Sequence, residues 1–215
     1  ITKEDSRDIN QWSGTSLNIY KCLKKTRFNI VRVGPLKNFY EKILKIFEII
    51  YRFLNIKFDP DRDIYLSKIL ANIIKKKLNK KKIDLIIVHD CPLISFLKIS
   101  IPIVIWTDLT FDLFQKSYFK NYNKFHNSSV VQGNYLEKLS LKKAKQIVYS
   151  TKYAADNAKK KYFISNEKIK IIPFGFDTTP LSKKKFFIIQ KKRIRDKKKV
   201  AKFLSIGVDW NRKNM

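Results

Sequence analysis

The chain has 215 residues, of which 44% are hydrophobic and 13% aromatic, and this apolar content excludes wholesale disorder. The length fits one complete domain plus part of a second. The formal net charge of +29 favours contact with nucleic acid, an anionic membrane or a phosphorylated substrate. We expect no nucleic-acid binding, because the lysines are spread along the chain and do not form one basic segment.

Compartment and processing signals are few. No apolar run approaches the roughly 18 residues of a membrane-spanning helix, and no signal peptide is visible. The two cysteines, Cys22 and Cys91, lack metal-ligand spacing and indicate a reduced, cytoplasmic setting. The chain begins with Ile1, so we expect that its first strand is truncated.

Along the chain, apolar runs typical of strands alternate with stretches of helical periodicity. We expect, in order, the tail of a strand at 1–2, a helix at 15–25, a strand at 28–33, helices at 39–54 and 64–78, a strand at 83–88, a short helix at 93–97, a strand at 101–106, helices at 111–122 and 133–145, a strand at 146–149, a helix at 151–162 and a strand at 169–172. This alternation predicts an α/β fold with a Rossmann-like, doubly wound parallel sheet over residues 1–175. The polar segment 176–199 is interpreted as a linker, and 200–215 as the truncated start of a second domain.

Ligands of such sheets bind beyond the carboxyl ends of the strands, so the residues that follow each predicted strand are the candidates. In the loop Trp12-Ser13-Gly14-Thr15, the glycine lets the backbone approach a substrate. Ser13 or Thr15 is expected to cap the following helix and present N–H groups to an anion; the alternative is an ordinary capped loop. No metal site is expected.

Three further pairs follow predicted strands. His89 and Asp90 are either an acid–base pair or partners in structural hydrogen bonds. Asp108, beside Thr107, is placed to accept a hydrogen bond from an acceptor hydroxyl; the alternative is that Asp108 or Thr110 caps the next helix. Ser150 and Thr151 follow the strand at 146–149, and capping of the next helix is their simplest interpretation.

The end of the chain carries a different pattern. The apolar run at 203–206 stops at Gly207, and the cations Arg212 and Lys213 follow closely. A strand that ends in a glycine turn beside cations is typical of a phosphate site, because backbone N–H groups and charges converge there.

Taken together, these motifs resemble glycosyltransferase family 4 of the GT-B superfamily. The resemblance spans most of the chain and rests on WSGT (12–15), IVIWTD (103–108), QIVYST (146–151), KIKIIPFGFD (168–177) and FLSIGVDWNRK (203–213). It implies two Rossmann-like domains that face each other across a cleft. It also implies retaining transfer of a sugar from a nucleotide-sugar donor to an acceptor such as a polysaccharide, a lipid-linked glycan or another glycan.

The resemblance also assigns roles to individual residues. It places Gly14, Arg212 and Lys213 at the donor phosphates and makes Asp108, at or next to a position where many members have a His, the catalytic candidate. On the acceptor side it places Ser13, Thr15, Thr107 and Ser150. No metal cofactor is expected if the cations meet the charge of the leaving diphosphate.

Some positions depart from the family pattern. Ser13 stands where many members have a second glycine, and Val208 where many have an Arg. The paired glutamates of the family would lie beyond the last residue, so the 215 residues alone are expected to be inactive. The alternatives are a non-catalytic sugar- or nucleotide-recognition domain of the same fold and a basic nucleic-acid-binding module.

The segment 39–58 raises the question of a membrane partner. It combines an apolar stripe with the flanking cations Lys37, Lys42, Lys45, Arg52 and Lys57. Such a helix can lie on an anionic membrane and would suit a lipid-linked acceptor. The expected location is then the cytoplasm, with peripheral contact at the inner face of the membrane. The alternative is a helix packed on the sheet, with its lysines in solvent.

Overall fold

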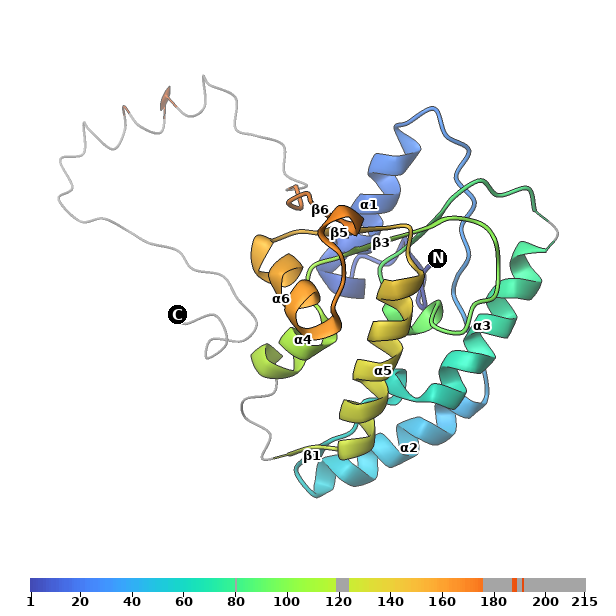
Figure 1. Ribbon diagram of the computed structural model, residues 1–215, viewed down its shortest axis with the longest axis vertical. Helices are drawn as coiled ribbons and strands as arrows, with labels where there is room; N and C mark the ends of the chain where they lie inside the picture. The colour runs from blue at the N-terminus through green and yellow to red at the C-terminus, as the bar shows by residue number, and fades with distance from the viewer. Residues whose placement is uncertain (80, 119–123, 176–186, 189–190, 192–215) are drawn as a thin grey trace. The chain divides into compact units, whose positions relative to one another are not determined.

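The computed structural model describes residues 1–79, 81–118, 124–175, 187–188 and 191. The chain divides into two units, Ile1–Phe174 and Gly175–Met215. In chain order the first unit contains the 3₁₀ turn η1 (Gln11–Gly14), α1 (Thr15–Lys24), α2 (Tyr40–Phe53), β1 (Ile56–Lys57), η2 (Pro60–Arg62), α3 (Ile64–Leu78), β2 (Ile86–Val88), η3 (Cys91–Leu93), β3 (Ile103–Thr107), α4 (Phe111–Tyr118), β4 (Lys124–Phe125), α5 (Asn127–Lys143), β5 (Gln146–Tyr149), α6 (Lys152–Tyr162), η4 (Asn166–Lys168) and β6 (Ile169–Ile171) (Figure 1).

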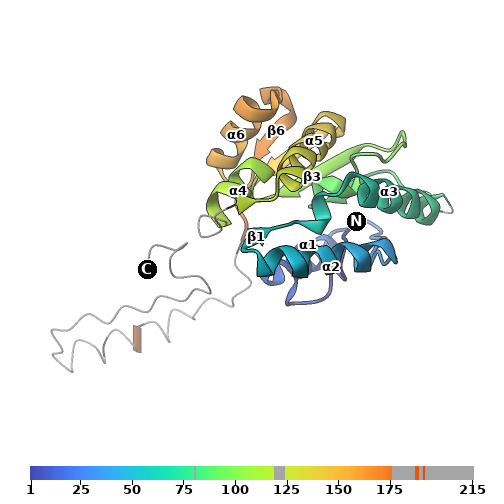
Figure 2. The same ribbon diagram turned by 90° about the horizontal axis from the view of Figure 1, so that it is seen from below.

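The centre of this unit is a parallel sheet. Its four strands lie in the order β2-β3-β5-β6, and all neighbouring pairs are parallel. A separate pair, β1 and β4, is also parallel. In Figure 2, α4, α5 and α6 lie on one side of the molecule and α1 and α2 on the opposite side. The Rossmann-like α/β class expected from the sequence is therefore confirmed.

Apolar side chains of the strands and helices form one core. Ile105 of β3 and Ile147 of β5 are fully buried, as is Ile74 of α3. On α6 the buried residues that face the core include Ala154 and Ala158, whose small side chains let this helix approach the sheet closely.

Several boundaries differ from those expected. The strands expected at 1–2 and 28–33 are wrong: Thr2 N donates to Val33 O (3.1 Å) and Leu36 N to Lys3 O (2.8 Å), but these two bonds do not extend into a ladder. The helix expected at 93–97 is instead the turn η3, which begins earlier because Pro92 suits the first turn of a helix. Helix α5 begins at Asn127 and not at Gly133, so the glycine lies inside it.

Other predicted elements agree closely with the structure. The helix at 64–78 and the strand at 146–149 have the expected bounds. The helices expected at 15–25 and 151–162 differ by one residue at one end, and the helix expected at 39–54 is one residue shorter at each end. The part of the helix expected at 119–122, the linker at 176–199 and the second-domain start at 200–215 lie wholly or largely outside the described residues. Within the described part of the chain, no helix is both long enough and apolar enough to cross a membrane.

Candidate functional site

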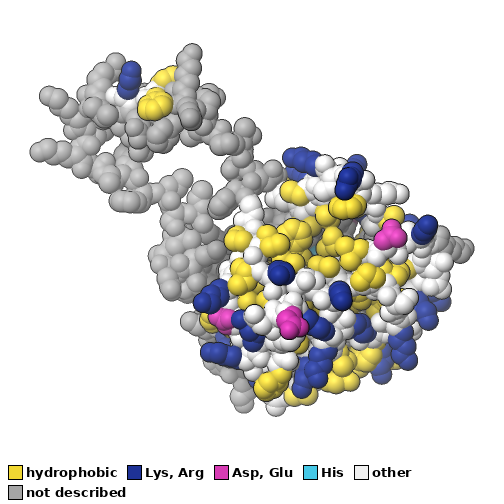
Figure 3. Space-filling model, turned by 45° about the horizontal axis from the view of Figure 1, so that its top comes forward, with side chains coloured by type: hydrophobic (Ala, Val, Ile, Leu, Met, Phe, Trp, Pro, Cys, Tyr) yellow, Lys and Arg dark blue, Asp and Glu magenta, His cyan; other side chains and the backbone are white. Residues whose placement is uncertain are grey.

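Two cavities of the first unit, among its described residues, are large enough to hold a small ligand. The larger, of about 750 Å³, is lined mainly by apolar residues of α1, of the segment 28–33 and of the region around β2. Figure 3 turns the top of Figure 1, where α1 lies, toward the viewer, and hydrophobic side chains gather there around a hollow. Because it offers few converging polar groups, this cavity is a poor candidate for a sugar or a phosphate.

The smaller cavity, of about 430 Å³, is polar and lies at the carboxyl ends of β2 and β3. This is the edge of a parallel sheet where ligands bind. Carboxylates outnumber cations among its charged lining residues, which are Lys3, Glu4, Asp5, Lys57, Asp59, Asp61, Arg62, Asp90, Asp108 and Glu137. In a chain with a net charge of +29, this is a local acidic site. Ionised carboxylates only accept hydrogen bonds, so the cavity suits a ligand rich in hydroxyl groups better than an anion.

The end of β2 supplies His89 and Asp90. The His89 Nε2 lies 3.9 Å from Asp90 Oδ2. The imidazole stacks on the indole of Trp12, with ring centroids 4.8 Å apart and an angle of 18° between the planes. Burial lowers the pKa of His89, against the opposing influence of Asp90 and Asp108. His89 is therefore a neutral imidazole at pH 7, held in place by Trp12.

The end of β3 supplies Thr107 and Asp108, both of which line the polar cavity as the sequence predicted. The alternative, that Asp108 or Thr110 caps α4, is confirmed for Thr110. Thr110 has this role, because its Oγ1 accepts from Leu113 N (3.4 Å) and also donates to Asn157 Oδ1 (2.5 Å). The Asp108 carboxylate is thus available to a ligand in the cavity.

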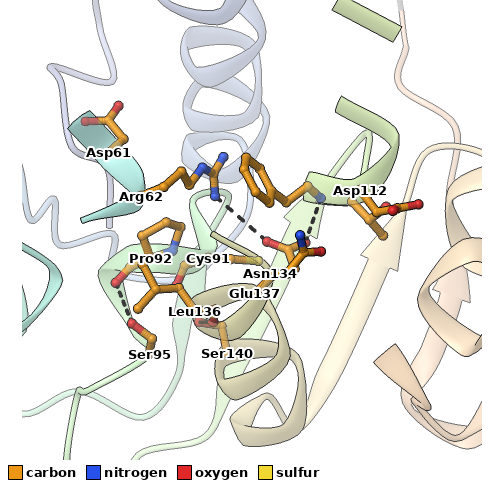
Figure 4. A network of polar contacts seen from close by, with 12 residues as sticks. Asp61, Arg62, Cys91, Pro92, Ser95, Asp112, Asn134, Leu136, Glu137 and Ser140 are labelled. Carbon is orange, nitrogen blue, oxygen red and sulfur yellow. Dashed lines mark hydrogen bonds and ion pairs between the residues drawn. The ribbon is translucent and has the colours of Figure 1, made fainter. Parts of the chain in front are cut away.

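A buried ion cluster forms one wall of the cavity (Figure 4). The Arg62 guanidinium lies between Asp59 (Nε–Oδ2, 3.5 Å) and Glu137 (Nη1–Oε2, 4.0 Å), and its central carbon is 4.4 Å from the centroid of the Phe111 ring. Burial raises the pKa of Glu137, while Arg62 opposes that shift. Burial likewise raises the pKa of Cys91 well above its usual value, so this residue is a thiol and not a nucleophile.

A second ion cluster ties the amino-terminal segment to the same cavity. Lys3 is paired with Asp61 and with Glu41 of α2, whose Oε1 is 3.1 Å from Lys3 Nζ. Burial disfavours the ammonium, but the two carboxylates outweigh it and raise the pKa of Lys3 above its usual value. Lys3 therefore remains charged and joins the first residues, α2 and η2 around the cavity.

The loop before α1 has an unusual backbone. Trp12, Ser13 and Gly14 have φ values of 48°, 51° and 79°, in the left-handed region that favours glycine. The sequence prediction that Ser13 or Thr15 caps α1 is wrong: the N-cap is Gly14, and no side chain bonds to the amides. An anion can bind at the start of α1 only if the backbone amides there are not already bonded to a capping side chain, and this condition is met.

The other predicted residues lie apart from the polar cavity. Its lining includes Trp12 but not Ser13, Gly14, Thr15 or Ser150. Ser150 N donates to Thr107 O (3.2 Å), and Thr151 caps α6 by accepting from Ala154 N (3.2 Å), as the capping interpretation predicted. The two predicted phosphate ligands, Arg212 and Lys213, lie outside the described residues.

Sequence reasoning missed the residues of the two ion clusters. The sequence predicts no role for Asp59, Asp61 or Arg62, and it places Glu137 only within the helix expected at 133–145. The available signal was Glu137 itself, a carboxylate next to the fully buried Leu136 of α5. Such a charge needs a partner. Among the residues that the structure describes, no group of three or more His, Cys, Asp or Glu side chains could hold a metal ion.

A comparison with protein families decides the identity of the domain. The family model described as Glycosyltransferase Family 4 matches residues 17–180, which is more than half of the chain. The chain belongs to glycosyltransferase family 4. This family 4 domain has no match among curated proteins, and no solved structure matches it. The resemblance inferred from the motifs is thereby confirmed.

Proposed function

We propose that this family 4 domain binds the acceptor of a retaining glycosyl transfer from a nucleotide sugar to a polysaccharide, a lipid-linked glycan or another glycan. The observation that carries the proposal is the polar cavity at the carboxyl ends of β2 and β3, in which Asp108 is free of a capping role. Carboxylates around it would accept hydrogen bonds from sugar hydroxyls.

In this proposal Asp108 is the catalytic residue. Its carboxylate would accept the hydrogen bond of the attacking acceptor hydroxyl and so increase the electron density on that oxygen. The neutral His89 beside it can donate or accept one hydrogen bond with its ring, and Asp90 can accept others. Thr107, in the cavity lining, is proposed to orient the acceptor, and Ser13, Thr15 and Ser150 are proposed to contact parts of the acceptor that extend beyond the cavity.

Donor binding is proposed for the loop at Gly14 and for the cations near the end of the sequence. The leaving nucleoside diphosphate is an anion, so the amides at Gly14 and the cations Arg212 and Lys213 would stabilise the charge that develops on it. If these groups meet that charge, the transfer needs no metal ion. The proposed location is the cytoplasm, at its membrane face if the acceptor is lipid-linked.

The test is transfer of label from a panel of radiolabelled nucleotide sugars by the full-length protein, with and without a chelator. Lys213→Ala is expected to reduce kcat/KM at least about a hundredfold, because removal of one such donor costs roughly 3 kcal/mol in the transition state. Lys76→Ala, at an exposed position of α3, is the matched control. Unchanged turnover in Lys213→Ala would remove the diphosphate role, and loss of turnover with the chelator would remove metal independence. Nucleotide binding without any transfer would favour a non-catalytic recognition domain.

A further inference from the structure

Helix α2 differs from an ordinary surface helix because its apolar stripe faces solvent together with its cations. A surface helix ordinarily buries its apolar stripe and turns its charged residues to solvent. In α2 the buried residues are Glu41 and Leu44, whereas Phe53 is 86% exposed and Ile46 is 58% exposed. The alternative of a helix packed on the sheet with its lysines in solvent is therefore wrong for the apolar stripe, although Lys42 and Lys45 are exposed as it expects.

Ion pairs hold the helix in this orientation. Glu41 binds Lys3 and Lys45, each at 3.1 Å, and Glu48 binds Lys57 at 2.9 Å. Rotation of α2 to bury its apolar stripe would break the buried Lys3 pair and expose Leu44. The orientation is thus fixed by the contacts of both carboxylates.

The rings at each end of the helix add to this anchoring. Tyr40 packs edge-on against Tyr65 of α3, with centroids 5.0 Å apart, and Tyr51 stacks on Phe58 at 5.5 Å. Both tyrosines lie on the side of the helix that carries Leu44. The opposite side is left without a partner in the described part of the chain.

The exposed face is large and mainly apolar, with Lys42 as a cation within it. At 100° per residue, its apolar side chains span an arc of about 160° over about 20 Å of helix. They are Phe39, Ile43, Ile46, Phe47, Ile49, Ile50, Phe53 and Leu54. The helix lies at the periphery of the molecule in both ribbon views (Figures 1 and 2). An exposed apolar surface of this kind marks an interaction site.

The charges around this face select its partner. Lys45 and Arg52 border it, Lys37 precedes it, and Lys42 lies within it, over the ring of Phe39, whereas the two acidic residues of α2 point toward the protein. A second copy of the chain would bring the same cations together, which is unfavourable. An anionic bilayer offers acyl chains to the apolar side chains and acidic head groups to the cations.

We propose that α2 docks in the interface of an anionic lipid bilayer, with the arc from Phe39 to Leu54 buried among the lipids. The inference does not depend on glycosyl transfer, because it rests on α2 alone. The net charge of +29 would add long-range attraction to such a surface.

The test is co-sedimentation of the protein with phosphatidylcholine vesicles that contain or lack phosphatidylserine. The wild type is expected to bind only the anionic vesicles. The triple variant Ile46→Ser/Ile50→Ser/Phe53→Ser is expected to bind them at least about tenfold more weakly, because each side chain loses apolar burial in the lipid. The matched control is Val131→Ser/Tyr153→Ser, which alters exposed apolar side chains of α5 and α6 and should bind as the wild type does.

Two further measurements keep the result unambiguous. Phe53→Trp retains the apolar face, and its emission should shift to shorter wavelength when anionic vesicles are added. Light scattering of the wild type and of the triple variant in solution measures whether the exposed face of α2 instead joins two copies of the chain. The proposal would be overturned if the wild type did not bind anionic vesicles at low salt, or if the triple variant bound them as well as the wild type does. It would also be overturned by an unshifted emission, or by a dimer that the triple variant abolishes. No sugar donor is present, so a failure here says nothing against the proposed transfer.

Discussion

Replacement of Gly133 by alanine tests the packing beneath the polar cavity. Gly133 lies inside α5, and a Cβ atom at this position would come within 2.1 Å of Cε1 and 2.4 Å of Cζ of Phe111. Ordinary contacts begin near 3.4 Å, so the ring would have to move by about 1.3 Å. Phe111 is only 2% exposed, and the Arg62 guanidinium lies over its ring. The ring therefore has little room to move.

The expected magnitude follows from two opposing effects. Overpacking of a core costs about 1–3 kcal/mol, whereas alanine gains about 1 kcal/mol over glycine in a helix. Because the overlap is large, we expect a net loss of about 2 kcal/mol in the free energy of unfolding. For a domain of this size, that corresponds to a fall in Tm of about 4–8 °C.

Urea unfolding followed by circular dichroism measures this loss. Val131→Ala, at a position of α5 that is 69% exposed, is the control and should change stability by less than about 0.5 kcal/mol. Adding Phe111→Leu to Gly133→Ala should recover part of the loss, since the smaller side chain leaves space for the new methyl group. A Gly133→Ala protein as stable as the wild type would refute the reasoning.

Three further predictions concern the loop and the walls of the cavity. Ser13→Gly should raise the free energy of unfolding by up to about 1 kcal/mol, because φ at this residue is 51°; a loss of stability in urea would contradict this. Burial lowers the pKa of His89 below 6.5, so below that pH the unfolded chain binds more protons than the folded protein and stability falls as the pH drops. His89→Phe keeps a ring against Trp12 and should reduce this slope in unfolding curves measured between pH 7 and 5; an unchanged slope would show that His89 is not its source. Arg62→Met leaves Glu137 buried without its cation and should cost about 3 kcal/mol, part of which is recovered at acid pH as Glu137 takes up a proton; a cost below about 1 kcal/mol would mean that the pair contributes little.

The sequence predicted the fold where periodicity was strong. The helix at 64–78 and the strand at 146–149 have clear patterns and correct bounds, because their apolar residues meet the core directly. The prediction failed where tertiary contacts, and not local periodicity, determine where a helix or strand begins. Gly133 was interpreted as a helix start, but it is a helix interior that has to be small beneath Phe111. Segment 28–33 has the composition of a strand but makes only isolated backbone bonds.

The candidate site was predicted in part, for a similar reason. Asp108 and His89 could be found because the carboxyl ends of parallel strands mark the ligand edge. Lys3 and Arg62 could not, because they meet their partners on α2 and α5 only through the packing of the fold, and Glu137 gave only the local signal of a carboxylate among apolar residues. The orientation of α2 was also hidden, since it depends on ion pairs with Lys3 and Lys57.

The most direct test of the proposed acceptor site is sugar transfer by Asp108→Asn in the full-length protein, with the donor and acceptor that the wild type uses. The amide keeps the size of the side chain but loses the charge that would act on the acceptor hydroxyl. We predict a fall in kcat/KM of at least about a hundredfold with an unchanged Tm, while Asp156→Asn, at the surface of α6, keeps full activity. Transfer by Asp108→Asn at the wild-type rate would contradict the account.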